Sequence, residues 1–141
     1  MKVLFDATFG ESWVEGIRAF FRLHQEPRPR ILHLYDSFPR DVKDEEWIPK
    51  LVGDDWLIII ADRGKGKAPR LPALCHQYKR THILLSTTMH VKVNQFNKAR
   101  AIILLWPKLI EAFLGTAGSC YEIQAQDANH LHFRLISKEI K

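Results

Sequence analysis

Acidic side chains follow two apolar runs of the sequence, at the points where buried strands are expected to end. Asp6 follows the run from Val3 to Phe5, and Asp62 follows the longer run from Trp56 to Ala61. In a parallel sheet the carboxyl ends of the strands meet at one edge, where ligands bind. Mg²⁺ and Mn²⁺ prefer carboxylate oxygens as ligands. The pattern therefore predicts a divalent-metal site at this edge, suited to water activation and to phosphodiester cleavage.

Three further acidic residues are candidates for the same site. Asp36 follows the alternating apolar stretch from Ile31 to Tyr35, which is expected to be a second strand. Asp44 and Glu45 open the stretch DEEWIPKL, which predicts a helix with Asp44 as its N-cap. Acidic residues at this end of the helix are expected near the loops that carry the first two aspartates. For any one aspartate a turn or cap role is the common alternative, and their repetition favours the metal site.

A basic loop, RGKGK, occupies residues 63–67. Its side chains Arg63, Lys65 and Lys67 predict contact with a nucleic-acid backbone, with a solvated turn as the equal alternative. A Walker-type nucleotide site is excluded because the lysine after the last glycine is followed by alanine rather than by Ser or Thr.

Hydroxyl groups and more lysines follow the apolar strand predicted at 83–85. Ser86 and Thr87 are candidates for ordering a phosphate or a water, although capping of the next helix is the more common role. Lys92 and Lys98 are expected to extend the basic surface toward nucleic acid.

The elements that position these residues alternate along the chain. The longest helix is expected at 94–114, with a kink at Pro107. No repeat or linker interrupts the chain. The order predicts an α/β fold in which helices cover a mostly parallel sheet, with a single domain of core 1–115 and a C-terminal hairpin at about 119–137. The strands are expected at 3–5, 31–35, 56–61, 83–85, 120–126 and 131–136, and the helices at 13–24, 44–51, 69–78 and 94–114.

The overall composition agrees with a protein that binds an anion. The 141 residues include 21 basic and 16 acidic side chains, for a net charge of +5, although a solvated basic surface is an equal alternative. Cys75 and Cys120 lack CxxC spacing, which predicts reduced thiols in a cytoplasmic protein. The longest apolar run, 101–106, is too short to cross a membrane.

Taken together, these motifs resemble the PIN-like domains, compact nucleases often found as toxins of bacterial toxin-antitoxin pairs. The similarity is carried by the strand ending in Asp6, the helix entered through DEEW at 44–47, and the strand IIIADRG ending in Asp62, and it covers roughly the first 115 residues. It implies a three-layer fold and a metal-dependent endoribonuclease, in which Asp6, Asp44 and Asp62 bind Mg²⁺ or Mn²⁺ to activate water. It also implies RNA as substrate, with an antitoxin protein and a second copy of the chain as partners.

The sequence departs from the family pattern at two places. Ala7 stands where a polar residue is usual, and no acidic residue lies near Ser86, where a fourth is expected; Asp36 and Glu45 are the candidates to replace it. The alternatives are a catalytically inactive module that binds nucleic acid and a protein-interaction domain that pairs through its hairpin edge. A metal requirement distinguishes the nuclease from both alternatives. Salt-dependent RNA binding distinguishes the inactive nucleic-acid-binding module from the protein-interaction domain.

Overall fold

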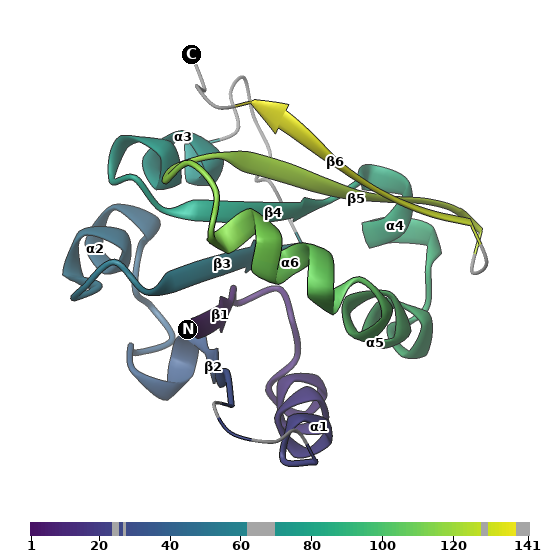
Figure 1. The fold of residues 1–141 in the computed structure, drawn as a ribbon. Coiled ribbons are helices and arrows are strands. Elements are labelled where there is room, and N and C mark those ends of the chain that lie inside the picture. The colour runs from purple at the N-terminus through teal and green to yellow at the C-terminus, as the bar shows by residue number, and fades with distance from the viewer. Residues whose placement is uncertain (24–25, 27, 62–69, 128–129, 138–141) are drawn as a thin grey trace.

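The computed structural model describes residues 1–23, 26, 28–61, 70–127 and 130–137. Within them, six strands form one sheet in the order β2-β1-β3-β4-β5-β6 (Figure 1). Neighbouring strands are parallel except for β5 and β6, which are antiparallel and form one edge of the sheet. The predicted α/β fold with a mostly parallel sheet and a C-terminal hairpin is therefore confirmed. The strands are β1 (Lys2–Phe5), β2 (Arg30–His33), β3 (Trp56–Ile60), β4 (Thr81–Leu85), β5 (Cys120–Asp127) and β6 (His130–Ser137).

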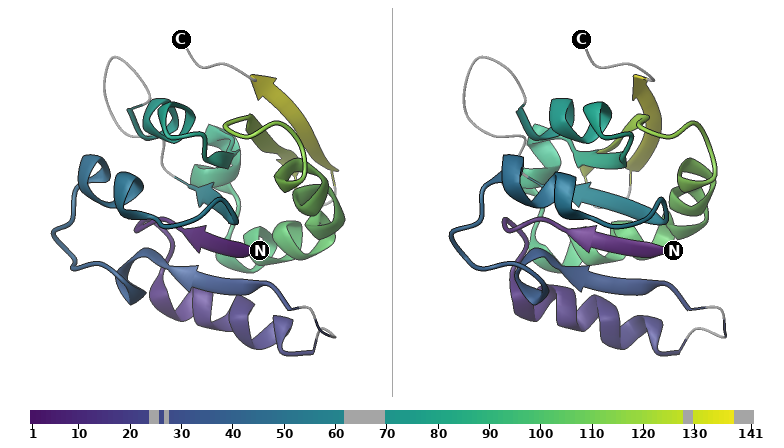
Figure 2. Two further views of the ribbon diagram at one scale, coloured as in Figure 1. Left: turned by 60° about the vertical axis from the view of Figure 1, so that its left-hand side comes forward. Right: turned by 90° about the vertical axis from the view of Figure 1, so that its left-hand side faces the viewer.

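Helices cover both faces of this sheet, which gives three layers (Figure 2). One face packs against α1, α5 and α6, and the other packs against α2 and α3. The helices are α1 (Glu11–Phe21), α2 (Asp44–Lys50), α3 (Arg70–Gln77), α4 (Thr87–Lys92), α5 (Gln95–Leu104) and α6 (Trp106–Phe113), with one 3-10 turn, η1 (Leu34–Asp36).

The apolar run of β3 illustrates why a strand of this sheet has no polar face. Leu57 and Ile59 pack with the α1, α5 and α6 core, whereas Ile58 and Ile60 pack with the α2 and α3 core. All four side chains are fully buried. A parallel strand that is covered on both sides needs such a continuous apolar sequence, and an alternating one would bury polar groups.

The second strand is shorter than predicted. It ends at His33, and the next three residues form η1 instead of continuing to Tyr35. The backbone N–H of His33 donates to the Asp36 carboxylate at 2.8 Å, and the backbone N–H of Tyr35 donates to His33 Nδ1 at 3.0 Å. These two side-chain contacts satisfy backbone groups locally, so the strand ends here.

The prediction of one kinked helix at 94–114 is wrong. Asn94 caps α5, since its side chain accepts the backbone N–H of Asn97 at 2.8 Å, and the chain then breaks at Leu105 before α6 begins. Pro107 has no N–H to donate and lies in the first turn of α6, where none is needed. A separate short helix, α4, also precedes α5.

Among the described residues, no helix is both long and apolar enough to span a membrane.

Candidate metal centre

Asp6 lies at the carboxyl end of β1, on the face of the sheet that α2 and α3 cover. Leu4 belongs to the core on that face, and side chains alternate along a strand, so Asp6 continues on the same side. Its backbone N–H donates to the carbonyl of Ile59 at 3.1 Å, which extends the pairing of β1 with β3 by one residue. The strand pairing thus holds the Asp6 carboxylate at the edge of the sheet. Asp6 is only 4% exposed.

The surroundings of Asp6 favour its neutral form. Burial raises the pKa of this carboxyl from 3.8 to about 7, and the negative charge of Asp44 adds to the increase. The Thr8 hydroxyl donates to Asp6 Oδ2 at 3.4 Å. Backbone N–H groups of Ala61 and Thr8 lower the pKa in part, yet no described group completes a hydrogen bond to the buried Oδ1. A cation bound here would stabilise the ionised carboxylate, for which the described residues provide no ion pair.

Asp44 opens α2, but it is the first helical residue and not the N-cap that the sequence predicts. Lys43 occupies the cap position without a side-chain hydrogen bond, and Asp44 Oδ1 instead accepts the indole N–H of Trp47 at 3.0 Å. Trp47 is fully buried, so this bond both satisfies its N–H and fixes the carboxylate. Because α2 connects β2 to β3, its first residue lies at the carboxyl edge of the sheet, where Asp6 also lies.

The two carboxylates share their surroundings with a buried thiol. Burial raises the pKa of Cys75, and the charges of Asp44 and Asp6 raise it further. Cys75 belongs to α3, so β1, α2 and α3 converge on one site. The thiol remains protonated there and contributes an apolar wall rather than a ligand.

The pair of Asp6 and Asp44 fits a hard divalent cation, because each offers a carboxylate oxygen and their negative charges oppose each other. No group of three His, Cys, Asp or Glu residues suited to metal binding occurs among the described residues. Asp62, the third predicted ligand, lies outside them, although it directly follows Ala61, whose N–H group lowers the pKa of Asp6. Glu45 is the second residue of α2 and is half-buried beside this pair.

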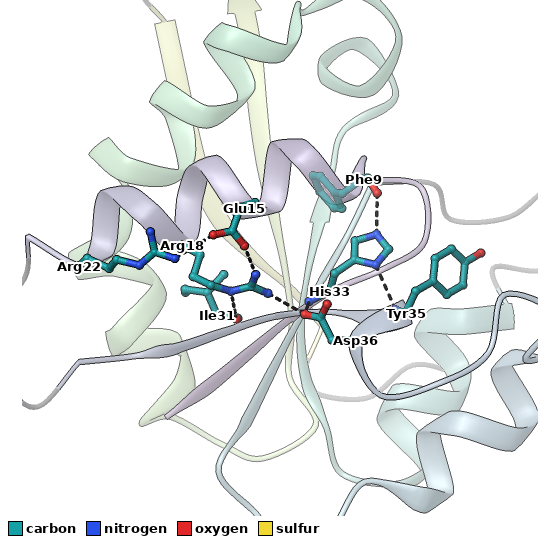
Figure 3. A network of polar contacts seen from close by, with 8 residues as sticks. All are labelled: Phe9, Glu15, Arg18, Arg22, Ile31, His33, Tyr35 and Asp36. Atoms are coloured by element: carbon teal, nitrogen blue, oxygen red, sulfur yellow. Dashed lines mark hydrogen bonds and ion pairs between the residues drawn. The ribbon is translucent and has the colours of Figure 1, made fainter.

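Asp36 has a different environment from Asp6 and Asp44. Its carboxylate pairs with the guanidinium of Arg18 at 2.6 Å and accepts the backbone N–H of His33 at 2.8 Å (Figure 3). Arg18 also donates to the carbonyl of Ile31 at 3.0 Å. Since β2 is an edge strand, this pair satisfies backbone groups that no neighbouring strand reaches. The contacts support a structural role for Asp36.

His33 supports the turn that carries Asp6, a role that the sequence did not reveal. This buried ring donates from Nε2 to the Phe9 carbonyl at 2.7 Å, while Nδ1 accepts the backbone N–H of Tyr35, which fixes a neutral tautomer (Figure 3). The backbone N–H of Phe9 in turn donates to the Asp6 carbonyl at 3.2 Å. Asp36, three positions after His33, completes a capping box with it. This spacing was the sequence signal that could have predicted the turn.

The hydroxyl groups after β4 take the alternative role considered for them. Ser86 is the N-cap of α4, and its side chain accepts the backbone N–H of Met89 at 3.1 Å. Thr87 is the first residue of α4 and is exposed.

One of the lysines predicted to contact nucleic acid is not at the surface. Lys98 is only 6% exposed, and its ammonium donates to the carbonyl of His90 at 2.8 Å. This burial argues against the predicted nucleic-acid contact at Lys98, because the ammonium is already bonded to the backbone of α4. Lys92, by contrast, is exposed at the end of α4. The basic loop with Arg63, Lys65 and Lys67 lies outside the described residues.

Comparison with known families supports the resemblance noted in the sequence. The profile of the PIN like domain matches residues 1–75, more than half of the chain, and includes both Asp6 and Asp44. Neither the curated proteins nor the solved structures give a match. Members of this family are often nucleases and typically bind metal ions. The chain belongs to the PIN-like domain family.

Proposed function

We propose that this protein is a metal-dependent endoribonuclease whose Mg²⁺ or Mn²⁺ is bound by Asp6 and Asp44 together with Asp62. The observation that carries the proposal is the state of Asp6. Its carboxyl is buried and has a pKa of about 7, one of its oxygens has no hydrogen bond from a described group, and a second acid lies nearby. Burying such a group costs free energy of folding. Such groups concentrate at functional sites, because a structural role would be better served by a neutral side chain.

The residues of the site have distinct roles in this proposal. Asp6 provides a ligand that is more deeply buried than Asp44, and β1 and the turn at Phe9 hold it in place. Asp44 provides the second ligand, oriented by the indole of Trp47. A bound divalent cation would lower the pKa of water and neutralise charge on the scissile phosphate. Because Asp6 must release a proton to bind a cation, metal affinity is expected to increase with pH up to about 7.

The charge of the protein and its family support the proposed substrate and partner. A net charge of +5 supports binding of an anion such as RNA, with exposed Lys92 as one contact and the loop at 63–67 as another. We extend the proposal to a toxin that an antitoxin protein restrains, and to action in the cytoplasm. The two cysteines are free and buried, which suits a reducing compartment.

The test is cleavage of a mixed RNA pool in the presence of Mn²⁺ or Mg²⁺, with EDTA as one control. Asp6→Asn and Asp44→Asn are expected to abolish cleavage, because each removes a carboxylate ligand. Asp41→Asn is the matched control: it removes one exposed acidic charge from the loop before α2 and is expected to cleave like the wild type.

Cleavage that persists in EDTA or in Asp6→Asn would contradict the proposal. If the wild type binds RNA in a salt-sensitive manner but does not cleave it with either metal, the protein is instead an inactive PIN-like RNA-binding module.

A further inference from the structure

A second site lies away from the two carboxylates, between α1 and the start of β2. It is a cavity of about 420 Å³, within the range of small-molecule sites, which is about 300–1,000 Å³. Four arginines line it, together with a floor of Phe21, Pro29, Ile31 and Leu32 and a single acidic residue, Asp36. The arginines are Arg18, Arg22, Arg28 and Arg30.

The arginines differ in how far neighbouring acids neutralise them. Arg18 is held by Glu15, by Asp36 and by the carbonyl of Ile31 (Figure 3). Arg22 pairs with Glu15 at 2.8 Å, and Arg28 pairs with Glu26 at 3.5 Å.

Arg30 is different, since within the described part of the chain its guanidinium makes no hydrogen bond or ion pair, and its side chain is exposed. Among the described residues, the cavity therefore offers the guanidinium of Arg30 to a ligand, while the other three arginines are paired with acidic side chains.

The floor of the cavity suits a flat apolar group. Pro29 and Leu32 are half-buried and expose apolar surface to the cavity, whereas Phe21 (4% exposed) and Ile31 (3% exposed) belong to the core beneath. A second hollow of about 200 Å³ shares Arg28 and Pro29 with the first and continues the apolar surface over Trp106. A guanidinium binds phosphate, and an apolar surface beside it packs against a base. The two together therefore suit a single-stranded nucleic acid, in which phosphates alternate with bases.

The cavity is separated from the carboxylates along the direction of the strands. Arg30 is paired with Lys2 in the register of β1 and β2, and Asp6 lies four residues after Lys2, directly beyond the end of β1. At the rise of a parallel strand this separation is about 13 Å. Arg30 and Asp6 therefore lie at opposite ends of the parallel strands.

We propose that this cavity binds a nucleotide of single-stranded RNA, with Arg30 on its phosphate and the half-buried Pro29 and Leu32 beneath its base. The proposal rests on the ribonuclease function and extends it, since it adds a substrate-binding site remote from the cleavage site. An acidic peptide is the competing occupant, and the experiment distinguishes it.

The experiment measures binding of a fluorescently labelled single-stranded RNA in EDTA, so that neither metal nor cleavage enters the result. Arg30→Ala is expected to weaken binding about tenfold, the loss of one charge-assisted hydrogen bond. The control Lys50→Ala removes the same charge from the exposed end of α2, and is expected to change affinity by less than about twofold. AMP should displace the RNA from the wild type, and inorganic phosphate should do so only at higher concentration.

Equal losses in Arg30→Ala and Lys50→Ala would overturn the proposal, since only the net charge would then matter. Displacement by oligoglutamate as effective as displacement by AMP would also overturn it and would favour an acidic peptide. Because these measurements are made without metal, the proposal can fail while the cleavage test succeeds. Arg30-dependent binding by a protein that does not cleave would conversely support this site and reject the nuclease.

Discussion

Asp6, at the end of β1, and Asp44, at the start of α2, interact unfavourably. Burial raises the pKa of Asp6 to about 7, and the negative charge of Asp44 raises it further. Thirty-seven positions separate the two residues in the sequence, and the alternation of strands and helices brings them to the same edge of the sheet. A fold that holds two acids in this arrangement gives up stability, which is expected where the acids serve a ligand.

Replacing Asp6 by Asn should stabilise the metal-free protein. The Asp6 carboxyl has a pKa of about 7 in the folded protein and 3.8 in the unfolded chain. As the pH rises above 3.8 the unfolded chain ionises first, so the ionised carboxylate favours unfolding. Asp6→Asn removes this penalty, which reaches about 4 kcal/mol at full ionisation as an order-of-magnitude upper estimate. Urea unfolding in EDTA should show an advantage for the variant that grows between pH 4 and pH 7 and stays constant above it. Asp41→Asn, as a control, should show no such pH dependence; a destabilised Asp6→Asn protein at pH 8 would contradict the assignment.

Asp36 is predicted to stabilise the fold without binding the metal. Asp36→Ala removes the acceptor for the His33 backbone N–H and the partner of Arg18, at a cost of about 1–2 kcal/mol. Most of that cost comes from the hydrogen bond, since the ion pair is partly exposed to solvent. Thermal unfolding should show a lower Tm for Asp36→Ala, with the increase in Tm on adding Mn²⁺ unchanged. Loss of that increase would instead make Asp36 a metal ligand.

The two lysines at α4 and α5 should differ in their effect on RNA binding. Lys92→Ala should reduce the slope of log affinity against log salt by about one, as expected for the loss of one phosphate contact. Lys98→Met should leave RNA affinity and its salt dependence unchanged, because the Lys98 ammonium is buried against the His90 carbonyl. Equal effects of the two substitutions would show that Lys98 reaches the RNA.

His82 should make the protein sensitive to acid. Its ring is fully buried in β4, and burial lowers its pKa from 6.5 to about 4. The unfolded chain therefore takes up a proton near pH 6.5 that the folded chain accepts only near pH 4, so the free energy of unfolding falls through this range. The loss reaches about 3 kcal/mol as an order-of-magnitude estimate. His82→Leu should flatten this part of the pH profile in urea unfolding, whereas His132→Gln, at an exposed position on β6, should not.

Much of the architecture could be predicted because it depends on local apolar patterns. The run ending at Ile60 can only be buried on both faces, and the alternating stretches that form β5 and β6 predict the hairpin at the sheet edge. The place of Asp6 at the end of a buried strand could also be predicted, since it follows the first apolar run directly.

The features that were missed depend on contacts between distant residues or on competition between side chains and backbone. β2 ends at His33 because the His33 ring and the Asp36 carboxylate accept hydrogen bonds from the backbone there. A period-two pattern of apolar residues contains no information about such bonds. Lys98 shares the buried side of α5 with Ala101 and Ile102, at spacings of three and four residues. Its charge suggested the surface, while its position on the helix indicated the core.

The most direct measurement of the central claim is a calorimetric titration of Mn²⁺ into the wild type, Asp6→Asn, Asp44→Asn and the control Asp41→Asn, at pH 6 and pH 8. The wild type and Asp41→Asn should bind Mn²⁺ more tightly at pH 8, with release of a proton at pH 6, because Asp6 must ionise to bind the cation. Asp6→Asn and Asp44→Asn should bind at least about tenfold more weakly, as expected when a ligand carboxylate is lost. Equal Mn²⁺ affinity in all four proteins would place the metal elsewhere and would contradict the proposed site.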